Sequence, residues 1–296
     1  MPKVLVTGSS GFIAPHVIES CLKSNYDVIG IDLKDPEIKI KNCKYIKDDV
    51  RNYKITDLEN IDFIIHLAFI TNIPNSIQNP LKTTNDNINM TVDLLDKATK
   101  AKIKKFVFSS TASLYGNNPL PWKESMPITP GEPYSWQKYA CEVLCKMWSE
   151  RYSLATCTLR LYQVYGENQR QDTAISKFIK SKKENKPITL TETTAQSSFR
   201  SARRDFIYVK DCANAFVAAT KSIKAINGEV FNIGTGNMIT IEDVAKTIGG
   251  KITFIPKRSF EVDAHQADMT KTYKSLDWKH EVEILPWLKK FIGESD

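Results

Sequence analysis

Tyr134 and Lys138, in the middle of the chain, have the residue types and the spacing of a proton-transferring pair. A free tyrosine has a pKa of about 10, which makes it a poor base at neutral pH, but a nearby positive charge stabilises its phenolate. Glu132-Pro133 is typical of a helix start, and residues four apart on a helix share a face. Ordinary surface pairs have the same spacing, so this pair alone leaves both interpretations open.

A glycine-rich segment near the amino terminus has the features of a nucleotide-binding loop. Val4-Leu5-Val6 has the apolar, β-branched character of a buried parallel strand, and Gly8 and Gly11 follow it at once. Gly8 permits a tight turn, Gly11 lets the backbone approach a pyrophosphate, and Ala14 stands where the dinucleotide fingerprint needs a small residue. The helix that opens through Pro15 would offer its N–H groups and positive dipole end to the phosphates.

The next predicted strand supports a dinucleotide site. Residues 27–31 form an apolar run that ends at Asp32, roughly twenty positions after the glycines, where a carboxylate meets the hydroxyls of the adenosine ribose. A carboxylate there repels a 2′-phosphate, so the sequence favours NAD over NADP. The alternative, a glycine-rich turn without a ligand, is disfavoured because strand, loop, helix and acidic residue occur in the expected order.

The composition is that of an ordinary globular protein. With 296 residues the chain can bury one large core, or one core with a smaller lobe. Hydrophobic residues make up 42% and charged residues 25%, and no apolar run reaches the length of a membrane span. Because Met1-Pro2-Lys3 leads straight into the first predicted strand, we expect no signal peptide, a cytoplasmic location and no membrane partner.

The cysteines and the charge predict neither a metal site nor a nucleic-acid partner. The six cysteines show no metal-ligand or disulfide-framework spacing, so we expect reduced, mostly buried thiols. The net charge is +7, but the lysines are spread over predicted helix faces, including 97–105 and 177–186. A basic protein also suits a diphosphate-bearing substrate, through electrostatic steering.

The pattern of apolar runs predicts an α/β fold with a Rossmann-type, doubly wound parallel sheet. We expect strands at 4–6, 28–31, 63–67, 106–108 and 156–161, and helices near 13–23, 88–100 and 134–151. Residues 1–166 would form an NAD-binding domain, joined by about 205–233, of which 204–209 and the following helix return to the main sheet. Residues 167–296 would form mainly a smaller, interleaved substrate-binding lobe, with the polar stretch 191–202 as a loop beside the substrate.

Short motifs follow one another in a fixed order along nearly the whole chain. They are Thr7-Gly8 with Gly11-Phe12-Ile13, Asp49-Val50-Arg51, His66-Leu67-Ala68, Asn87 with Thr91 and Leu94-Leu95, Phe108-Ser109-Ser110-Thr111, Leu114-Tyr115-Gly116, Tyr134 with Lys138, Leu159-Arg160 through Tyr165-Gly166, Arg204-Asp205-Phe206-Ile207-Tyr208-Val209, and Phe231-Asn232-Ile233-Gly234-Thr235-Gly236. Together they resemble the extended short-chain dehydrogenase/reductase group, the NAD-dependent epimerases and dehydratases that act on nucleotide sugars. The resemblance implies NAD as cofactor and a nucleotide-diphosphate sugar as substrate.

The resemblance also implies a role for individual residues. Tyr134 matches the acid/base, Thr111 the group that hydrogen-bonds the reacting substrate oxygen, and Lys138 the residue that holds the nicotinamide ribose and lowers the tyrosine pKa. The remaining implied cofactor-binding residues are Gly8, Gly11, Phe12, Ile13, Asp32, Asp49, Val50, Leu67, Ala68, Phe69, Asn87 and Ser109. The implied substrate-binding residues are Thr111, Gln163, Arg204 and Arg258, and the two arginines would grip the diphosphate.

Departures from the family's patterns narrow the reaction. Sugar 4,6-dehydratases carry Asp-Glu directly after the active-site threonine, where this chain has Ala112-Ser113. Nucleotide-sugar decarboxylases place a Glu at the position that Ser113 occupies. Gln163 stands where many members have Asn, and the loop before Arg204 lacks their glycines, so the substrate is not fixed by the resemblance.

Three functions remain open from the sequence. An NAD-dependent epimerase that inverts C4 of a nucleotide-diphosphate hexose through a transient 4-keto intermediate is favoured. An NAD(P)H-dependent reductase of nucleotide-linked 4-ketosugars is the second, although Asp32 argues against the NADPH that many reductases prefer. A non-catalytic NAD-binding module is the third, although Thr111, Tyr134 and Lys138 are intact. Family members commonly dimerise through two helices, so we expect a homodimer through 88–100 and 134–151, with Met147 and Trp148 as contacts or core residues.

Overall fold

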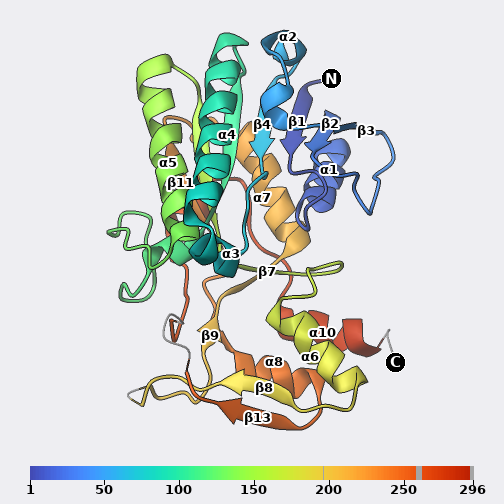
Figure 1. Cartoon of the computed structure of the whole chain (residues 1–296), viewed down its shortest axis with the longest axis vertical. Helices are drawn as coiled ribbons and strands as arrows, with labels where there is room; N and C mark the ends of the chain where they lie inside the picture. The colour runs from blue at the N-terminus through green and yellow to red at the C-terminus, as the bar shows by residue number, and fades with distance from the viewer. Residues whose placement is uncertain (196, 258–261, 294–296) are drawn as a thin grey trace.

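A seven-stranded sheet forms the centre of the computed structural model, which describes residues 1–195, 197–257 and 262–293 (Figure 1). Its strands are β1 (Lys3–Thr7), β2 (Asp27–Asp32), β3 (Cys43–Lys47), β4 (Phe63–His66), β5 (Lys105–Thr111), β6 (Thr156–Leu161) and β11 (Glu229–Ile233). The strand order is β11-β6-β5-β4-β1-β2-β3, and every neighbouring pair runs parallel. The order reverses at β1, the switch point beside which ligands of open parallel sheets bind.

Side chains of the strands fill a hydrophobic layer on each face of the sheet. In β1, Val4 and Val6 face one layer and Leu5 faces the other, and all three are completely buried. A strand covered on both faces needs a continuous apolar run, which is why the sequence indicated β1, β2, β4, β5 and β6. The sequence did not indicate β11 or β3, and β3 is an edge strand whose lysines face solvent and interrupt the apolar signal.

Helices cover both faces, which confirms the predicted α/β, doubly wound class. Figure 1 shows α4 and α5 together on one side of the sheet and α1 and α7 on the other, and both pairs are in contact. The helices around this sheet are α1 (Ala14–Lys23), α2 (Ile55–Leu58), α3 (Ile73–Gln78), α4 (Pro80–Lys100), α5 (Pro133–Tyr152) and α7 (Val209–Lys221), with two 3₁₀ turns, η1 (Val50–Asn52) and η2 (Ala112–Tyr115). Helix α4 begins earlier than the predicted 88–100, because Pro80 suits a first helical turn.

A smaller lobe lies beyond the carboxyl ends of the sheet strands, at the bottom of Figure 1. It consists of α6 (Ala174–Lys183), β8 (Ile188–Thr191), α8 (Ile241–Ile248), β13 (Ile252–Ile255) and α10 (Ile284–Gly293). Strands β8 and β13 pair in parallel, and the lobe has its own hydrophobic cluster. Between lobe and sheet run β7 (Gln163–Tyr165), β9 (Arg203–Arg204), β10 (Phe206–Tyr208) and β12 (Ile239–Thr240), and α9 (Thr270–Ser275) follows the lobe's strands.

One detail of the predicted chain path is wrong. The strand within 204–209 does not return to the main sheet, because β10 pairs with β7 in a separate two-stranded sheet. The edge position beside β6 is taken by β11, which pairs with residues 157–161 of that strand. Ala267 and Trp278, which lie late in the chain, pack into the hydrophobic layer of the main sheet.

The cysteines are placed as the sequence predicted. Cys21, Cys141, Cys145, Cys157 and Cys212 are buried, Cys43 is partly exposed, and all six are free thiols. Within the described ranges, none of the helices has both the length and the apolar character needed to cross a membrane.

Candidate active site

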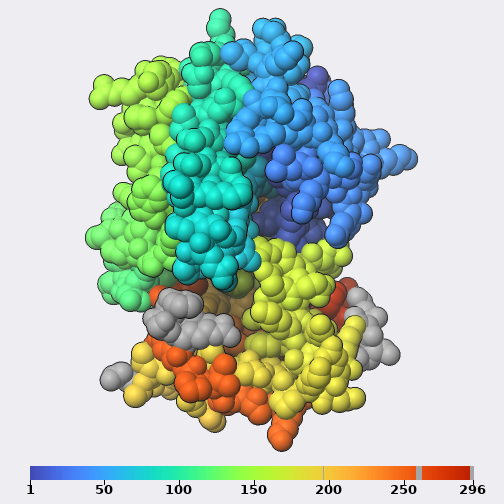
Figure 2. All heavy atoms as spheres, in the orientation of Figure 1, coloured from blue at the N-terminus to red at the C-terminus, as the bar shows by residue number. Residues whose placement is uncertain are grey.

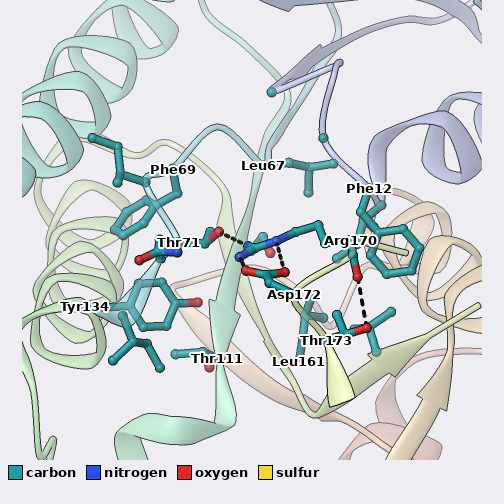
Figure 3. A pocket seen from close by; sticks show the side chains of 18 of the residues that line it. Phe12, Leu67, Phe69, Thr71, Thr111, Tyr134, Leu161, Arg170, Asp172 and Thr173 are labelled. Carbon is teal, nitrogen blue, oxygen red and sulfur yellow. Dashed lines mark hydrogen bonds and ion pairs between the residues drawn. The ribbon is translucent and has the colours of Figure 1, made fainter. Parts of the chain in front are cut away.

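A cleft of about 1220 Å³ lies between the carboxyl ends of the sheet strands and the smaller lobe. Figure 2 shows the upper body, blue to green, meeting the yellow and orange lobe along this boundary, and Figure 3 shows the cleft from close by. The predicted site residues that line it are Gly8, Gly11, Phe12, Ile13, Asp32, Asp49, Val50, Leu67, Ala68, Phe69, Asn87, Ser109, Thr111, Tyr134, Lys138, Gln163 and Arg204. Arg258, the remaining predicted residue, lies outside the described residues.

The loop between β1 and α1 needs glycine at residue 8. Gly8 has a φ of +70°, and a Cβ there would lie 2.7 Å from the backbone nitrogen of Ala68. The Gly8 N–H donates to the carbonyl of Ile31 at 2.9 Å, which ties the loop to the end of β2. In the described part of the chain no side chain caps the start of α1, so its first-turn N–H groups are available to an anion in the cleft.

Asp32 ends β2 beside this loop. Its Oδ2 accepts the N–H of Ser10 at 3.0 Å, and its Oδ1 accepts the N–H of Lys34 at 3.1 Å. These two contacts orient the carboxylate at the cleft and leave lone pairs on each oxygen for further donors. Hydroxyl groups of a sugar are donors of this kind.

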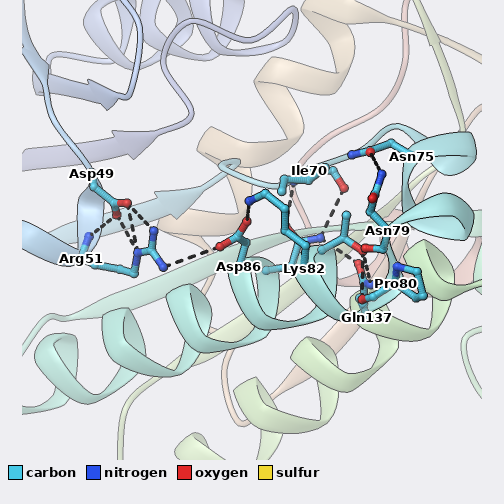
Figure 4. Close-up of polar contacts among 11 residues, drawn as sticks. Asp49, Arg51, Ile70, Asn75, Asn79, Pro80, Lys82, Asp86 and Gln137 are labelled. Carbon is cyan, nitrogen blue, oxygen red and sulfur yellow. Dashed lines mark hydrogen bonds and ion pairs between the residues drawn. The ribbon is translucent and has the colours of Figure 1, made fainter.

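Asp49 lies on the cleft wall next to a series of charged residues. Arg51 Nη2 lies 2.6 Å from Asp49 Oδ2, and this hydrogen bond lowers the pKa of Asp49. Arg51 also reaches Asp86 of α4, with 3.8 Å between Nη1 and Oδ1, and Asp86 pairs with Lys82 (Figure 4). The Asp49 carboxylate is therefore engaged by the protein, and the contacts tie η1 to α4 along the cleft.

The loop 67–69, which follows β4, is held from the helix behind it. Asn87 of α4 is completely buried, accepts the N–H of Ile70 at 2.8 Å and donates to Gln137 Oε1 at 2.8 Å. Both ends of the Asn87 amide are thus used within the protein. We infer that Asn87 positions the loop that faces the cleft.

Tyr134 lies in the first turn of α5 and points into the cleft (Figure 3). Its ring meets Phe69 edge to face, with 6.0 Å between the centroids. Burial raises the pKa of Tyr134 to about 12; the hydrogen bond with Thr111 lowers it, the charge of Glu132 raises it, and the charge of Arg170 lowers it. At neutral pH the hydroxyl is therefore protonated, and removing its proton requires additional positive charge nearby.

Lys138 lies one turn further along α5 and is only 2% exposed. Its ammonium donates to the carbonyl of Ser109 at 2.6 Å and lies 3.7 Å from the centroid of the Phe69 ring. Burial lowers the pKa of Lys138 to about 7. The helix places Tyr134 and Lys138 in one cleft, but the ammonium's hydrogen-bond acceptor among the described residues is Ser109.

Thr111 ends β5 opposite Tyr134 (Figure 3). Its Oγ1 accepts the N–H of Ser113 at 3.2 Å and lies 3.0 Å from the Ser113 hydroxyl. Ala112, the next residue, is buried in the hydrophobic layer of the sheet. Positions 112 and 113 therefore provide no carboxyl group to the cleft.

The lobe side of the cleft carries the predicted substrate residues Gln163 and Arg204. Gln163 begins β7, and its N–H donates to the carbonyl of Asp205 at 3.0 Å. The Arg204 Nη1 donates to the carbonyl of Arg203 at 2.9 Å. The Asp205 carboxylate accepts backbone N–H groups of Thr235, Gly236 and Ala267.

Arg170 is a cleft residue that the sequence did not indicate. It lies after β7, and its Nη1 donates to the hydroxyl of Thr71 at 2.9 Å, across the cleft (Figure 3). Its Nε donates to Asp172 at 2.9 Å. In the sequence Arg170 is one more cation in a polar stretch, and only the folded chain brings it opposite Tyr134.

The sheet side of the cleft fits a bound dinucleotide. Gly8 leaves room where any other residue would clash, the start of α1 is free of a side-chain cap, and Asp32 lies beside both. These are the donors, the space and the acceptor that a pyrophosphate and an adenosine ribose require. Tyr134 and Lys138 line the same cleft, where a nicotinamide would complete the site.

Comparison with known proteins agrees with this geometry. The model of the NAD dependent epimerase/dehydratase family matches residues 4–234. A UDP-glucuronate 4-epimerase from Thermodesulfobacterium geofontis is 31% identical, over 98% of this chain and 95% of its own. A putative UDP-glucose 4-epimerase from Methanocaldococcus jannaschii is 31% identical, over 98% of this chain and 97% of its own. The crystal structure of a UDP-glucuronic acid 4-epimerase from Bacillus cereus, in complex with UDP-glucuronic acid and NAD, has a TM-score of 0.87 and 29% identity, and covers 99% of this chain and 100% of that one.

Proposed function

The chain belongs to the NAD dependent epimerase/dehydratase family, and we propose that it inverts C4 of a nucleotide-diphosphate hexose through a transient 4-keto intermediate, with NAD as cofactor. One observation carries the proposal: a single cleft brings Thr111, Tyr134 and Lys138 together with the loop of Gly8. Ala112 and Ser113 offer no carboxyl group for the elimination of water, so the same cleft does not support a dehydratase.

In the proposed reaction the residues of the chain handle a proton. Tyr134 takes the proton of the C4 hydroxyl and later returns it to the same oxygen, while Thr111 hydrogen-bonds that oxygen. NAD, when bound, supplies the chemistry that accepts and returns a hydride at C4. Because burial raises the pKa of Tyr134 to about 12, the phenolate requires positive charge near the hydroxyl, and Lys138 lies on the same wall of the cleft.

We propose that the sheet side of the cleft holds NAD. Gly11 would let the backbone approach the pyrophosphate closely, the N–H groups of Phe12 and Ile13 would bind it, and Asp32 would bind the adenosine ribose. Asp49 and Val50 would contact the adenine, and the loop 67–69, with Ser109 beside it, would lie against the nicotinamide half. Lys138 would hold the nicotinamide ribose.

We propose that the lobe side holds the sugar nucleotide. Arg204 lines this wall, and its planar set of donors suits a diphosphate. Gln163 lies on the same wall and would reach the substrate with its amide. In this division, residues 1–166 with about 205–233 bind the cofactor, and 167–296 form mainly the substrate lobe.

We also propose a homodimer through the outer faces of α4 and α5, which pack side by side. Trp136, Val143 and Met147 of α5 are exposed, although they are large and apolar. Trp148, in contrast, packs against the core layer of the sheet. Light scattering after size exclusion should give the mass of two chains for the wild type and of one chain for Val143→Asp.

The experiment that tests the proposed function begins with the cofactor. The purified protein is denatured, the released nicotinamide nucleotide is identified by absorbance and mass, and the native protein is screened with UDP-hexoses. Near-stoichiometric NAD and inversion at C4 without net redox change would support the epimerase. Protein that arrives empty, binds NADPH better than NADH and reduces a 4-ketosugar would overturn it.

A further inference from the structure

The ammonium group of Lys138 lies in the angle between two phenylalanine rings. Its Nζ is 3.7 Å from the centroid of the Phe69 ring and 4.8 Å from that of the Phe108 ring, and it lies over both rings. The two rings are inclined to each other at 61°, with 6.2 Å between their centroids. Phe69 follows β4, Phe108 belongs to β5 and Lys138 belongs to α5, so only the folded chain forms this aromatic pair, Phe69 and Phe108, around the ammonium.

The surrounding structure holds both rings in place. Phe108 is completely buried in the hydrophobic layer between the sheet and the helices α4 and α5, and Phe69 packs against the same layer. Next to Phe69, the N–H of Ile70 donates to Asn87 Oδ1 at 2.8 Å, which fixes the loop. The Phe69 ring also meets the Tyr134 ring edge to face. Phe69 therefore contacts both residues that are proposed for proton transfer.

Lys138 has no carboxylate partner among the described residues. Glu142, one helical turn further along α5, is paired with Arg160, with 2.7 Å between Oε2 and Nη2. The hydrogen bond of the ammonium goes to the carbonyl of Ser109, which carries no net charge. The titratable groups around the ammonium are His66 of β4 and, on α5, Tyr134, Cys141, Glu142 and Cys145.

These groups do little to keep Lys138 charged. Burial lowers the pKa of Lys138 to about 7, and the weaker effects of Cys141, Glu142 and Cys145 raise it. Burial lowers the pKa of His66 to about 3, so this ring is neutral at neutral pH and does not repel the ammonium. Because the pKa of Lys138 is close to neutral pH, a further contact that favours the ammonium decides how much of it is charged.

An aromatic ring can supply such a contact without cancelling the charge. The face of the ring carries negative partial charge and attracts a cation within about 6 Å, most strongly where water is excluded. Lys138 is only 2% exposed, so water is excluded here. A carboxylate would also stabilise the ammonium, but its own negative charge would oppose the phenolate of Tyr134. A ring has no net charge, so the positive field of Lys138 still acts in the cleft.

We propose that Phe69 and Phe108 are positioning residues that keep the Lys138 ammonium charged and in place at the cleft, and that Phe69, the nearer ring, makes the larger contribution. The contact itself rests on geometry. Its role in catalysis rests on the proposed function, in which the charge of Lys138 stabilises the Tyr134 phenolate that takes the proton of the C4 hydroxyl.

The test replaces Phe69 alone with phenylalanine analogues that carry one, two or three fluorine atoms on the ring. Fluorine withdraws electron density from the face of the ring and leaves its shape nearly unchanged, so the attraction weakens while the packing is kept. Lysines labelled with ¹³C at the ε carbon are titrated by NMR, and Lys138→Arg identifies the signal. The pKa of Lys138 should fall with each added fluorine, by about one unit for three.

Phe108 and Phe106 provide matched comparisons on the strand β5. Three fluorine atoms on Phe108, the more distant ring, should shift the titration less than three on Phe69. On Phe106, which is also completely buried, they should shift nothing, because no cation of the described residues lies over this ring. A pKa of Lys138 that stays constant across the Phe69 series would mean that the ring only packs against the lysine, and would overturn the inference.

Two ordinary substitutions keep the inference testable if the fluorinated protein does not fold. Phe69→Leu removes the aromatic face and should lower the pKa of Lys138, whereas Phe69→Tyr keeps the face and should leave it near the value of the wild type. Equal values in the two variants would also overturn the inference.

The outcomes separate the inference from the proposed function. The titration needs no substrate, so it decides on the aromatic pair even if the protein proves not to be an epimerase. If C4 inversion is found, turnover at pH 7 should fall about fivefold with three fluorine atoms on Phe69, because a pKa lowered from about 7 to about 6 leaves roughly a tenth instead of half of Lys138 charged. Turnover that stays constant while the titration shifts would overturn the role of the aromatic pair in catalysis.

Discussion

Two ion pairs show how the two sides of the molecule differ. In the sheet domain, Arg160 and Glu142 form an ion pair in which both side chains are 4% exposed. In the smaller lobe, Arg200 and Glu192 form an ion pair in which the side chains are 62% and 46% exposed. Each nitrogen of the buried Arg160 guanidinium makes a hydrogen bond, with Nη2 2.7 Å from Glu142 Oε2, Nη1 2.7 Å from the hydroxyl of Tyr115 and Nε 3.1 Å from Glu142 Oε1. His66 is completely buried between the hydroxyls of Thr7 and Thr91.

The residues proposed for proton transfer belong to the sheet side, and Gln163 and Arg204, which are proposed to bind the sugar nucleotide, belong to the lobe side. Buried, fully paired polar groups fix one geometry, because any displacement leaves a group without a partner in a medium of low dielectric. Exposed ion pairs contribute little energy, because water replaces either partner. The side of Tyr134 and Lys138 is therefore expected to be rigid and sensitive to substitution, and the side of Arg200 to tolerate it.

The largest effect is expected from Tyr134→Phe, which removes the hydroxyl on the rigid side. Turnover of the substrate identified in the UDP-hexose screen should fall by about 10² to 10⁴-fold, because this is the contribution of a positioned acid/base. The content of NAD in the purified protein should remain that of the wild type. Tyr152→Phe, at the exposed end of α5, is the matched control and should keep full activity. Comparable rates for Tyr134→Phe and the wild type would remove Tyr134 from the mechanism.

Arg160→Met should give the largest loss of stability. Removing one partner of a buried ion pair leaves the other charge uncompensated, at a cost of about 3 to 5 kcal/mol in the free energy of unfolding. Denaturant unfolding measures the loss, and the double variant Arg160→Met/Glu142→Leu should recover part of it. A loss below 1 kcal/mol would mean that the sheet side is no more constrained than the lobe side.

His66 should make the sheet side sensitive to acid. Burial lowers its pKa to about 3, whereas an unfolded chain has a histidine pKa of about 6.5. Between these two pKa values the unfolded state binds a proton at this histidine and the folded state does not. The free energy of unfolding is therefore highest above pH 6.5 and falls toward pH 3, by up to about 1.4 kcal/mol per pH unit. In His66→Gln, urea unfolding at pH 7, 6 and 5 should show a smaller slope. A slope equal to that of the wild type would exclude His66 as its source.

The smallest effect is expected from Arg200→Met on the lobe side. An exposed ion pair contributes about 1 kcal/mol or less, and the contact of the guanidinium with the Phe254 ring, 3.7 Å away, adds a similar amount at most. The free energy of unfolding should fall by no more than about 1 kcal/mol in low salt, and by less in high salt. A loss as large as that of Arg160→Met would contradict the comparison between the two sides.

Some features were predictable because a short stretch of sequence carries the whole signal. The strand 4–6, the glycines after it and Asp32 predicted the doubly wound sheet and a dinucleotide loop before any contact was known. Residue 8 must be glycine because its φ is +70° and because Ala68 lies close to it, and the sequence shows both requirements through this one glycine. In contrast, β3 was missed because its exposed lysines hide the apolar pattern.

Other features depend on residues that meet only in the folded chain. Arg170 lies opposite Tyr134 because β7 and the turn after it cross the cleft, and a cation in a polar stretch carries no sign of that. The sequence indicated Glu132 only as part of a helix start, and Ser113 only as a position without a carboxyl group. In the structure the two are linked by hydrogen bonds through Ser135.

The sequence by itself determined the class of the fold, the order of the motifs and the residue types that face the cleft, because backbone conformation and strand burial depend on neighbouring residues. The tertiary structure alone decided which polar groups are buried, and with them the pKa of Tyr134 near 12 and of Lys138 near 7. These values depend on the removal of water from a side chain and on charges brought close from distant parts of the chain. The sequence therefore predicts which two residues form the proton-transferring pair, but only the folded protein sets the protonation of the two groups.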